Sequence, residues 1–244
     1  MIVRNLQHVR DRITTACVAA GRNPASVQLL AVSKTCLLDA VIDAMNGGQC
    51  MFGENYIAEG VDKVLALRAW QALQPDEVTR LVQWHCIGPV QSNKTRLVAE
   101  HFDWVQSVDR LKIAQRLSEQ RPPHLPPLQI CLQVNVDGGA NKSGVAPADL
   151  MALAVQVAQL PRLRLRGLMT IPEPAINFEA ACVMHTRAKA IFDEINAAGI
   201  VPYLLDTLSM GMTADLEAAI HSGSTMVRVG TAIFGSRNYI STPT

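Results

Sequence analysis

The chain has 244 residues, of which 49% are hydrophobic and 18% are charged, so it holds enough apolar material for one large buried core. Its 22 basic and 21 acidic residues are mixed along the sequence and give a formal net charge of +1, which excludes a strong field toward nucleic acid or a membrane surface. We expect a soluble globular protein that has neither as a partner.

The cysteines are spread widely and predict thiols rather than disulfides or a metal site. No C-x-x-C pair occurs, and no histidine set lies near them at metal-ligand spacing. The N-terminal segment lacks the apolar core of a signal peptide, and no run approaches the roughly 18 apolar residues of a membrane span. These features predict a cytoplasmic protein without a metal. The cysteines are Cys17, Cys36, Cys50, Cys86, Cys131 and Cys182.

The first predicted element is an amphipathic helix over residues 2–20. Ile2, Leu6 and Val9 recur at helical spacing, and Gly21 follows as a stop. Residues 27–33 (VQLLAVS) then form a continuous β-prone apolar run, which is typical of a strand buried on both faces of a parallel sheet. Lys34 comes directly after this strand.

Apolar strands and helical segments alternate along the rest of the sequence. Helices are expected over 148–160, 178–198 and 214–221, the last with Thr213 as its N-cap, and the proline-rich segment 121–129 is a connector. One (β/α)8 barrel usually takes about 250 residues. Eight βα units after an extra N-terminal helix therefore predict the α/β class, as a single (β/α)8 TIM barrel with residues 1–244 in one domain. The other strands are expected at 50–53, 84–88, 103–108, 128–135, 165–171, 204–210 and 225–230.

Lys34 is the first candidate site residue, because functional groups of such a barrel gather at the carboxyl ends of its strands. An ammonium group there is partly desolvated, which favours the neutral amine that attacks an aldehyde and forms a Schiff base. A lysine that merely extends to solvent is the alternative. The helical segments place Lys63, Lys112 and Lys189 in ordinary exposed settings.

The loops after strands seven and eight are the candidate phosphate site. Barrels often hold a phosphate there with backbone N–H groups, which glycine lets an anion approach closely. These loops contain Ser209, Gly211, Gly230 and Thr231. The two glycines could also serve tight turns alone.

Arg228 lies within the eighth predicted strand, so its guanidinium needs a buried acceptor. A structural carboxylate is one candidate partner. The other is the ring nitrogen of a bound cofactor, since an arginine facing the ring of a lysine-bound pyridoxal is a recognised arrangement.

Long segments of the chain resemble the pyridoxal phosphate homeostasis protein family, whose members are single-domain relatives of the alanine racemase barrel. The segments are LLAVSKT (29–35), FGENY (52–56), WHCIGPVQSNK (84–94), NKSGV (141–145), LRGLMTIP (165–172) and the stretch 208–235. Two departures are Cys86, where the family pattern suggests a large aromatic, and a less acidic loop at 137–140.

The resemblance implies pyridoxal 5'-phosphate as the cofactor, with Lys34 forming the internal aldimine and Arg228 facing the pyridine nitrogen. It also implies that Asn55 and Met169 line the ring. The residues implied for the phosphate are Ser209, Gly211, Gly230 and Thr231.

Two functions compete once this cofactor is accepted: an amino-acid racemase, and a protein that buffers and delivers the cofactor. Racemisation needs two bases. Similar racemases take the second, a tyrosine, from an additional domain for which this sequence has no room. Tyr56 could approach the site, but such a residue more often packs or hydrogen-bonds at the rim. An arginine at the ring nitrogen also makes the ring a weaker electron sink. We expect a homeostasis protein with no efficient catalysis, and a weakly active racemase is the alternative.

A third function, a Schiff-base aldolase, is disfavoured because its lysine usually lies on a later strand. Lys94 and Lys142 lie in polar loops near the expected mouth, either as solvated charges or as a second landing point for the cofactor. The expected recipients are apo-enzymes that use the same cofactor, and the expected state is a monomer or weak dimer.

Overall fold

The structure is a computed structural model that describes residues 1–75, 81–139 and 143–235. Asn141 and Lys142, the first two residues of the segment NKSGV, lie outside these ranges.

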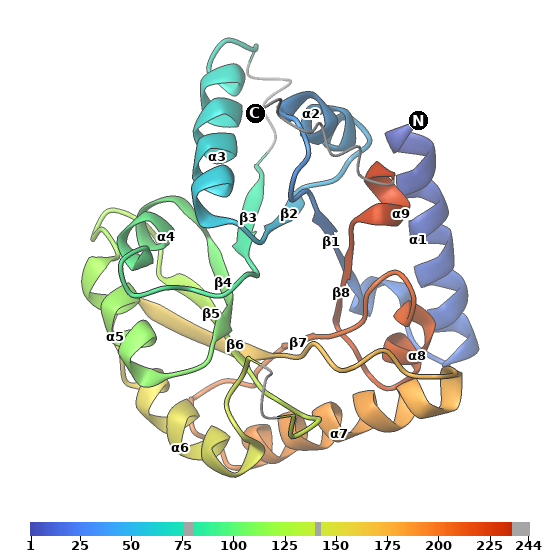
Figure 1. The fold of residues 1–244 in the computed structure, drawn as a ribbon, viewed down its shortest axis with the longest axis vertical. Coiled ribbons are helices and arrows are strands. Elements are labelled where there is room, and N and C mark those ends of the chain that lie inside the picture. The colour runs from blue at the N-terminus through green and yellow to red at the C-terminus, as the bar shows by residue number, and fades with distance from the viewer. Residues whose placement is uncertain (76–80, 140–142, 236–244) are drawn as a thin grey trace, which may run out of the picture.

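The strands of the described residues close into one parallel barrel in which each strand pairs with its neighbours in chain order (Figure 1). The first and last strands close it, with Leu30 opposite Arg228 and Ala31 opposite Val229. This arrangement confirms the predicted (β/α)8 barrel. The strands are β1 (Gln28–Val32), β2 (Met51–Glu54), β3 (Gln83–Cys86), β4 (Trp104–Val108), β5 (Leu128–Gln133), β6 (Leu163–Met169), β7 (Thr207–Ser209) and β8 (Met226–Val229).

Helices surround the barrel and separate its strands from solvent (Figure 1). Their bounds are α1 (Ile2–Ala19), α2 (Leu38–Asn46), α3 (Ile57–Gln71), α4 (Thr95–His101), α5 (Leu111–Gln120), α6 (Pro147–Ala158), α7 (Phe178–Ala197), α8 (Leu216–His221) and α9 (Thr231–Phe234), with a short 3₁₀ turn at Pro24–Ser26. None of the helices in the described ranges is long and apolar enough to cross a membrane.

The extra N-terminal helix α1 packs beside α8 and α9, as predicted (Figure 1). Leu6, Val9 and Cys17 are fully buried on one face, so the helical spacing of apolar residues has the expected cause. Gly21 ends the helix with φ 65°, a conformation that glycine adopts without the strain of a side chain.

The main hydrophobic core lies between the strands and the surrounding helices, whereas the inside of the barrel also holds polar groups. Gln106 of β4 contacts His85 of β3 (2.9 Å), Ser209 of β7 (2.7 Å) and Met226 of β8 (3.1 Å). Contacts with strands on the opposite wall are possible only across the interior. The barrel therefore contains a buried polar network directly beneath its open end.

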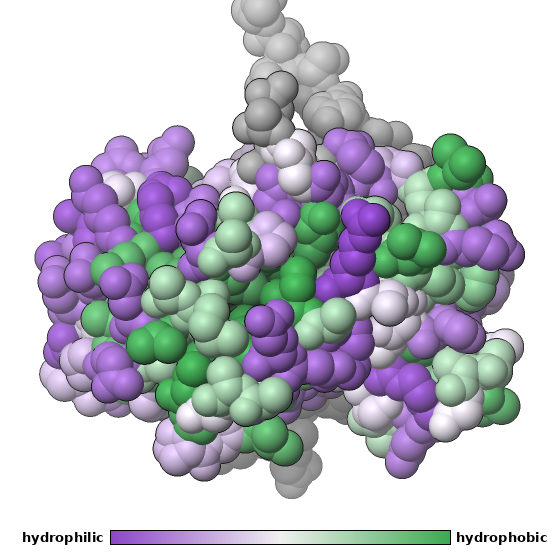
Figure 2. Space-filling view, turned by 90° about the horizontal axis from the view of Figure 1, so that it is seen from below, coloured by the Kyte–Doolittle hydropathy of each residue, from purple (hydrophilic) through white to green (hydrophobic). Residues whose placement is uncertain are grey.

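The outer surface on the side of α7 is mixed in character. Figure 2, seen from the lower edge of Figure 1, shows hydrophobic and hydrophilic side chains intermingled over this face. Val155 of α6 and Val183 of α7 are both exposed. Scattered exposed hydrophobic residues of this kind are normal on a protein surface.

The predicted N-cap of the eighth helix is wrong. Helix α8 begins at Leu216 with Asp215, not Thr213, at the N-cap position. The Asp215 carboxylate accepts the backbone N–H of Met212 (2.7 Å) and lies 2.9 Å from Nε2 of His185 in α7. These contacts hold residues 212–215 in a turn, so the helix starts later than the apolar pattern suggests.

Candidate functional site

A cavity of about 1190 Å³ opens at the carboxyl ends of the strands, where the loops after β1, β7 and β8 converge. Such a position is where barrel enzymes and binding proteins place their ligands. Among the predicted site residues, its wall contains Lys34, Asn55, Arg228, Gly230 and Thr231. The structure thus brings together the lysine after the first strand, the arginine of the last strand and the loop that follows it.

Lys34 is half-buried and lies two residues after the end of β1 at Val32. The strand is extended by one further bond, from the Ser33 N–H to the Gly53 carbonyl (3.0 Å). Thr35 then adopts a positive φ of 62°, which is uncommon for a β-branched residue. The chain therefore turns sharply at the point where the lysine enters the cavity wall.

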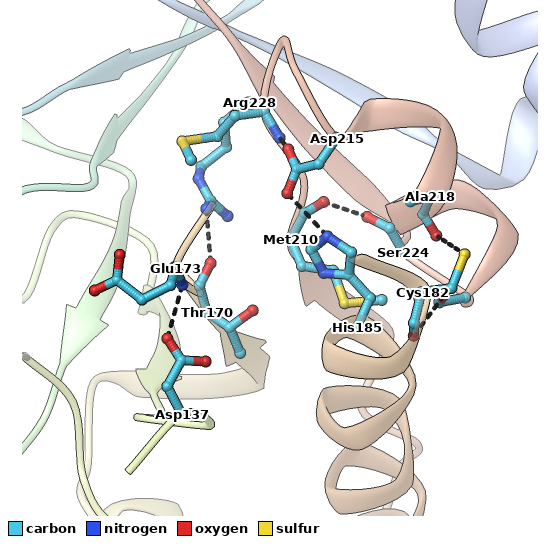
Figure 3. A network of polar contacts seen from close by, with 12 residues as sticks. Asp137, Thr170, Glu173, Cys182, His185, Met210, Asp215, Ala218, Ser224 and Arg228 are labelled. Atoms are coloured by element: carbon cyan, nitrogen blue, oxygen red, sulfur yellow. Dashed lines mark hydrogen bonds and ion pairs between the residues drawn. The ribbon is translucent and has the colours of Figure 1, made fainter. Parts of the chain in front are cut away.

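Arg228 is buried, with 4% of its surface exposed, and it reaches two neutral acceptors. Its Nη1 donates to Oγ of Ser209 (2.7 Å) and its Nη2 to the carbonyl of Thr170 (2.7 Å), the latter drawn in Figure 3. Burial lowers the pKa of Arg228 to about 10, and the nearby Asp215 opposes the shift. The guanidinium remains charged at neutral pH, and it holds N–H donors beyond these two bonds.

A chain of hydrogen bonds continues inward from Arg228. Because the guanidinium donates to Ser209, the Ser209 hydroxyl donates onward to Oε1 of Gln106, and Nε2 of Gln106 faces Nδ1 of His85. His85 stacks on Trp104 with ring centroids 4.9 Å apart. Burial lowers the pKa of His85 to about 3, so the ring is neutral. Its Nδ1 accepts, because the amide nitrogen of Gln106 can only donate.

Sequence reasoning missed the roles of His85 and Gln106. Their only signal was a polar residue inside an otherwise apolar strand, in WHC and WVQSV. A buried polar side chain needs a partner. The alternation of inward and outward positions would have placed both side chains inside the barrel.

The other predicted residues lie deeper or serve the backbone. Met169 is fully buried in a cluster with Trp104 and Cys131. Gly211 has φ 91°, and a Cβ there would lie 2.4 Å from Cβ of Ala219, so the tight turn itself requires glycine. The contacts expected of Met169, Ser209 and Gly211 with a cofactor stay predictions.

Among the described residues, the buried oxygen atoms without hydrogen-bond partners include Oδ1 of Asn55 and Oγ1 of Thr170, both near the mouth. Asn55 is packed closely against the loop after β3, because a Cβ on Gly88 would lie 2.0 Å from the Asn55 carbonyl oxygen. Buried polar atoms without partners are rare in folded proteins. Their presence beside a lysine amine and a buried guanidinium fits a polar ligand that completes the site.

The expectation that Lys63 is an exposed helical lysine is wrong. Lys63 of α3 has 6% of its surface exposed, and its Nζ bonds the Ser33 carbonyl (2.7 Å), Oε1 of Glu54 (2.7 Å) and Oε1 of Glu59 (3.0 Å). Ser33 and Glu54 belong to the ends of the first two strands. A pattern within one helix could not reveal these partners.

This geometry defines a class of protein: a parallel barrel that presents a lysine after β1 and a buried arginine in β8 to one cavity. The match to known proteins specifies the class further. A model described as "Alanine racemase, N-terminal domain" matches residues 4–238. The chain belongs to this family and, within it, to the pyridoxal phosphate homeostasis proteins.

Three relatives illustrate the match. The chain is 55% identical to the pyridoxal phosphate homeostasis protein of Pseudomonas aeruginosa, over 98% of this chain and 96% of the relative. It is 51% identical to the protein of that name from Escherichia coli K12, over 98% and 97%. The structure of PipY from Synechococcus elongatus with PLP bound superposes with a TM-score of 0.78 at 34% identity, covering 96% of this chain and all of that chain.

Proposed function

We propose that this protein binds pyridoxal 5'-phosphate at the mouth of its barrel and takes part in pyridoxal phosphate homeostasis, by buffering the cofactor and delivering it. One observation carries the proposal: Lys34 and Arg228, which come from the paired strands β1 and β8, line the same cavity. The relative PipY, 34% identical, has been solved with PLP bound, which supports this choice of ligand.

The residues present suit each part of that ligand. The cofactor supplies an aldehyde, and Lys34 supplies the amine that would hold it covalently. Arg228 presents a charged donor that keeps its proton at neutral pH, so it would orient a ring nitrogen without protonating it. Gly230 and Thr231 begin α9 at the cavity wall, where backbone N–H groups would receive a phosphate.

The racemase alternative has less support. A second base opposite Lys34 would have to enter the cavity, and of the described tyrosines neither Tyr56 nor Tyr203 belongs to its wall. Tyr56 is 57% exposed, and the ring of Tyr203 lies against Arg164, which enters β6 at the other end of the barrel. An unprotonated ring nitrogen beside Arg228 also weakens carbanion stabilisation.

The first experiment tests attachment at Lys34. Purified protein is mixed with the cofactor, reduced with borohydride and digested, and the modified lysine is identified by mass spectrometry. We expect the adduct on Lys34, its complete loss in Lys34→Ala, and no change in Lys189→Ala, whose lysine pairs with Asp193 on the surface of α7. An unchanged adduct in Lys34→Ala would contradict the proposal.

Delivery is tested by transfer to an apo-enzyme that requires the cofactor. Loaded protein and an equal concentration of free cofactor are compared in the presence of a phosphatase that destroys the free form. We expect the loaded protein to restore activity under conditions in which the free cofactor does not. Equal sensitivity to the phosphatase would contradict delivery.

We also propose a cytoplasmic location and a monomer or weak dimer. The location is supported by the cysteines, all of which are thiols in the structure, as suits a reducing compartment. Lys94 lies at the N-cap of α4 and is proposed as a solvated charge, with a weak second landing point as the alternative. A Lys94→Ala variant that loads more slowly than the wild type would favour the alternative.

A further inference from the structure

A cluster of buried Lys63, buried Glu54 and half-buried Glu59 holds the backbone on both sides of Lys34. Nζ of Lys63 donates to the carbonyl of Ser33, the residue before Lys34. Oε1 of Glu59 accepts both Nζ of Lys63 (3.0 Å) and the backbone N–H of Thr35, the residue after Lys34 (2.5 Å). The carbonyl before Lys34 and the N–H after it are therefore hydrogen-bonded to the two partners of one ion pair, Lys63 and Glu59.

The third member of the cluster, Glu54, fixes Lys63 from within the barrel wall. Oε1 of Glu54 accepts Nζ of Lys63 and the hydroxyl of Ser33 (2.6 Å). Glu54 is 1% exposed, and burial raises the pKa of its carboxyl while the Lys63 ammonium opposes the shift. All three ammonium N–H donors of Lys63 are therefore used within the cluster formed by the ends of β1 and β2 and the first turns of α3.

The backbone from Ser33 to Thr35 has a conformation that its residue types disfavour. Thr35 has φ 62°, and a β-branched residue rarely adopts this left-handed conformation without support. The backbone N–H of Cys36 closes this turn on the Ser33 carbonyl (3.0 Å), and the Thr35 N–H bond to Glu59 is the contact that ties the turn to α3. If the bond were lost, the segment would relax toward an ordinary conformation, and the direction in which Lys34 leaves the backbone would change.

The proposed function requires the Lys34 side chain to leave the backbone in a fixed direction. Covalent attachment needs the amine at bonding distance from one ligand atom, and small misplacements of a reacting group slow such reactions strongly. A flexible four-carbon side chain reaches that place most often when its backbone origin is fixed.

We propose that Lys63, with Glu54 and Glu59, is a positioning group that fixes the backbone from Ser33 to Thr35 and thereby aims the Lys34 amine at the bound cofactor. The inference rests on the proposed function. It assigns no direct contact between Lys63 and the cofactor.

The test separates binding from attachment. Glu59→Leu removes the acceptor of the Thr35 N–H at a half-buried position, Glu59→Gln keeps an oxygen there, and Lys63→Met removes the ammonium but keeps the chain length. Lys189→Met is the matched control, because it breaks a surface ion pair with Asp193. The rate of covalent attachment is followed by borohydride trapping and intact mass, and total binding is measured in a Lys34→Ala background, where attachment is absent.

We expect attachment to slow roughly ten- to hundredfold in Lys63→Met and Glu59→Leu. Glu59→Gln should attach at close to the wild-type rate, Lys189→Met should be unchanged, and total binding in the Lys34→Ala background should stay within about twofold. If Lys63→Met fails to fold, Glu59→Leu against Glu59→Gln decides the question.

Wild-type attachment rates in both Lys63→Met and Glu59→Leu would overturn the inference and leave the proposed function intact. Equal slowing in Glu59→Leu and Glu59→Gln would also overturn it, since the oxygen acceptor would then be irrelevant. Failure of the wild type to attach the cofactor at Lys34 is the separate result that would overturn the proposed function.

Discussion

Arg228 carries a charge in a buried strand because its guanidinium donates to two neutral acceptors, the Ser209 hydroxyl and the Thr170 carbonyl. The Ser209 hydroxyl accepts a hydrogen bond from the guanidinium and donates one to Oε1 of Gln106. Nε2 of Gln106 in turn donates to Nδ1 of His85. The direction of each bond follows from the one before it, since arginine can only donate. The arginine is thus oriented by a chain of side chains that runs from the adjacent strand β7 across the interior to β4 and β3, and it keeps N–H donors beyond its two bonds.

The neutral state of His85 predicts a dependence of stability on pH. Its folded pKa, about 3, lies below its ordinary value of 6.5, so the unfolded chain binds a proton that the folded protein cannot. The stability that this residue contributes is full above pH 6.5 and is lost as the pH falls toward 3. At about pH 5 the loss should be about 2 kcal/mol.

The measurement is the free energy of unfolding in denaturant at several pH values between neutrality and about pH 5. A His85→Gln variant should lose the one-proton slope, whatever its absolute stability. His124→Gln, at an exposed position, should keep it. The same slope in wild type and His85→Gln would show that His85 takes up its proton in the folded state.

Helices and strands are predictable from the sequence where a regular spacing of apolar residues determines them. The strands of the barrel are buried on both faces, so each reads as an apolar run, and all eight expected strands correspond to observed ones. Helix α1 likewise follows from Leu6 and Val9 on one face. Element ends were less predictable: α8 begins after Asp215 because that carboxylate is engaged by Met212 and His185, which the local sequence does not reveal.

The candidate site was predictable to a similar degree. Lys34, Arg228 and the loop at Gly230 could be placed at the mouth, because the position of a residue relative to a strand end fixes where it lies in a barrel. Lys63 could not, because its burial depends on Ser33 and Glu54, which only the pairing of β1 with β2 brings to α3. The sequence therefore shows which residues follow the strand ends, whereas it does not show which side chains of different helices and strands contact one another.

Across the whole molecule, the reactivity of the cysteine thiols measures both folding and occupancy of the cavity. Cys50 is exposed, Cys36 and Cys182 are half-buried, and the others are buried. Burial raises the pKa of Cys86 to about 12, so it reacts slowly in the folded protein. Alkylation followed by mass spectrometry should therefore modify Cys50 first and Cys86 only after unfolding.

Loading with the cofactor should slow alkylation of Cys36, because this residue belongs to the cavity wall. Cys182 has a similar exposure but lies on α7, outside that wall, and it provides the internal control. Equal slowing at both thiols would indicate general rigidification and would contradict a cofactor bound in this cavity.

The closure of the barrel by β1 and β8 determines when a ligand can first be held. Lys34 leaves the ribosome early and Arg228 late, so a growing chain presents the amine long before β8 supplies its part of the cavity wall. Because Lys34 and Arg228 line one cavity only when β8 has paired with β1, we expect both residues to hold a ligand together only in chains that have completed the barrel.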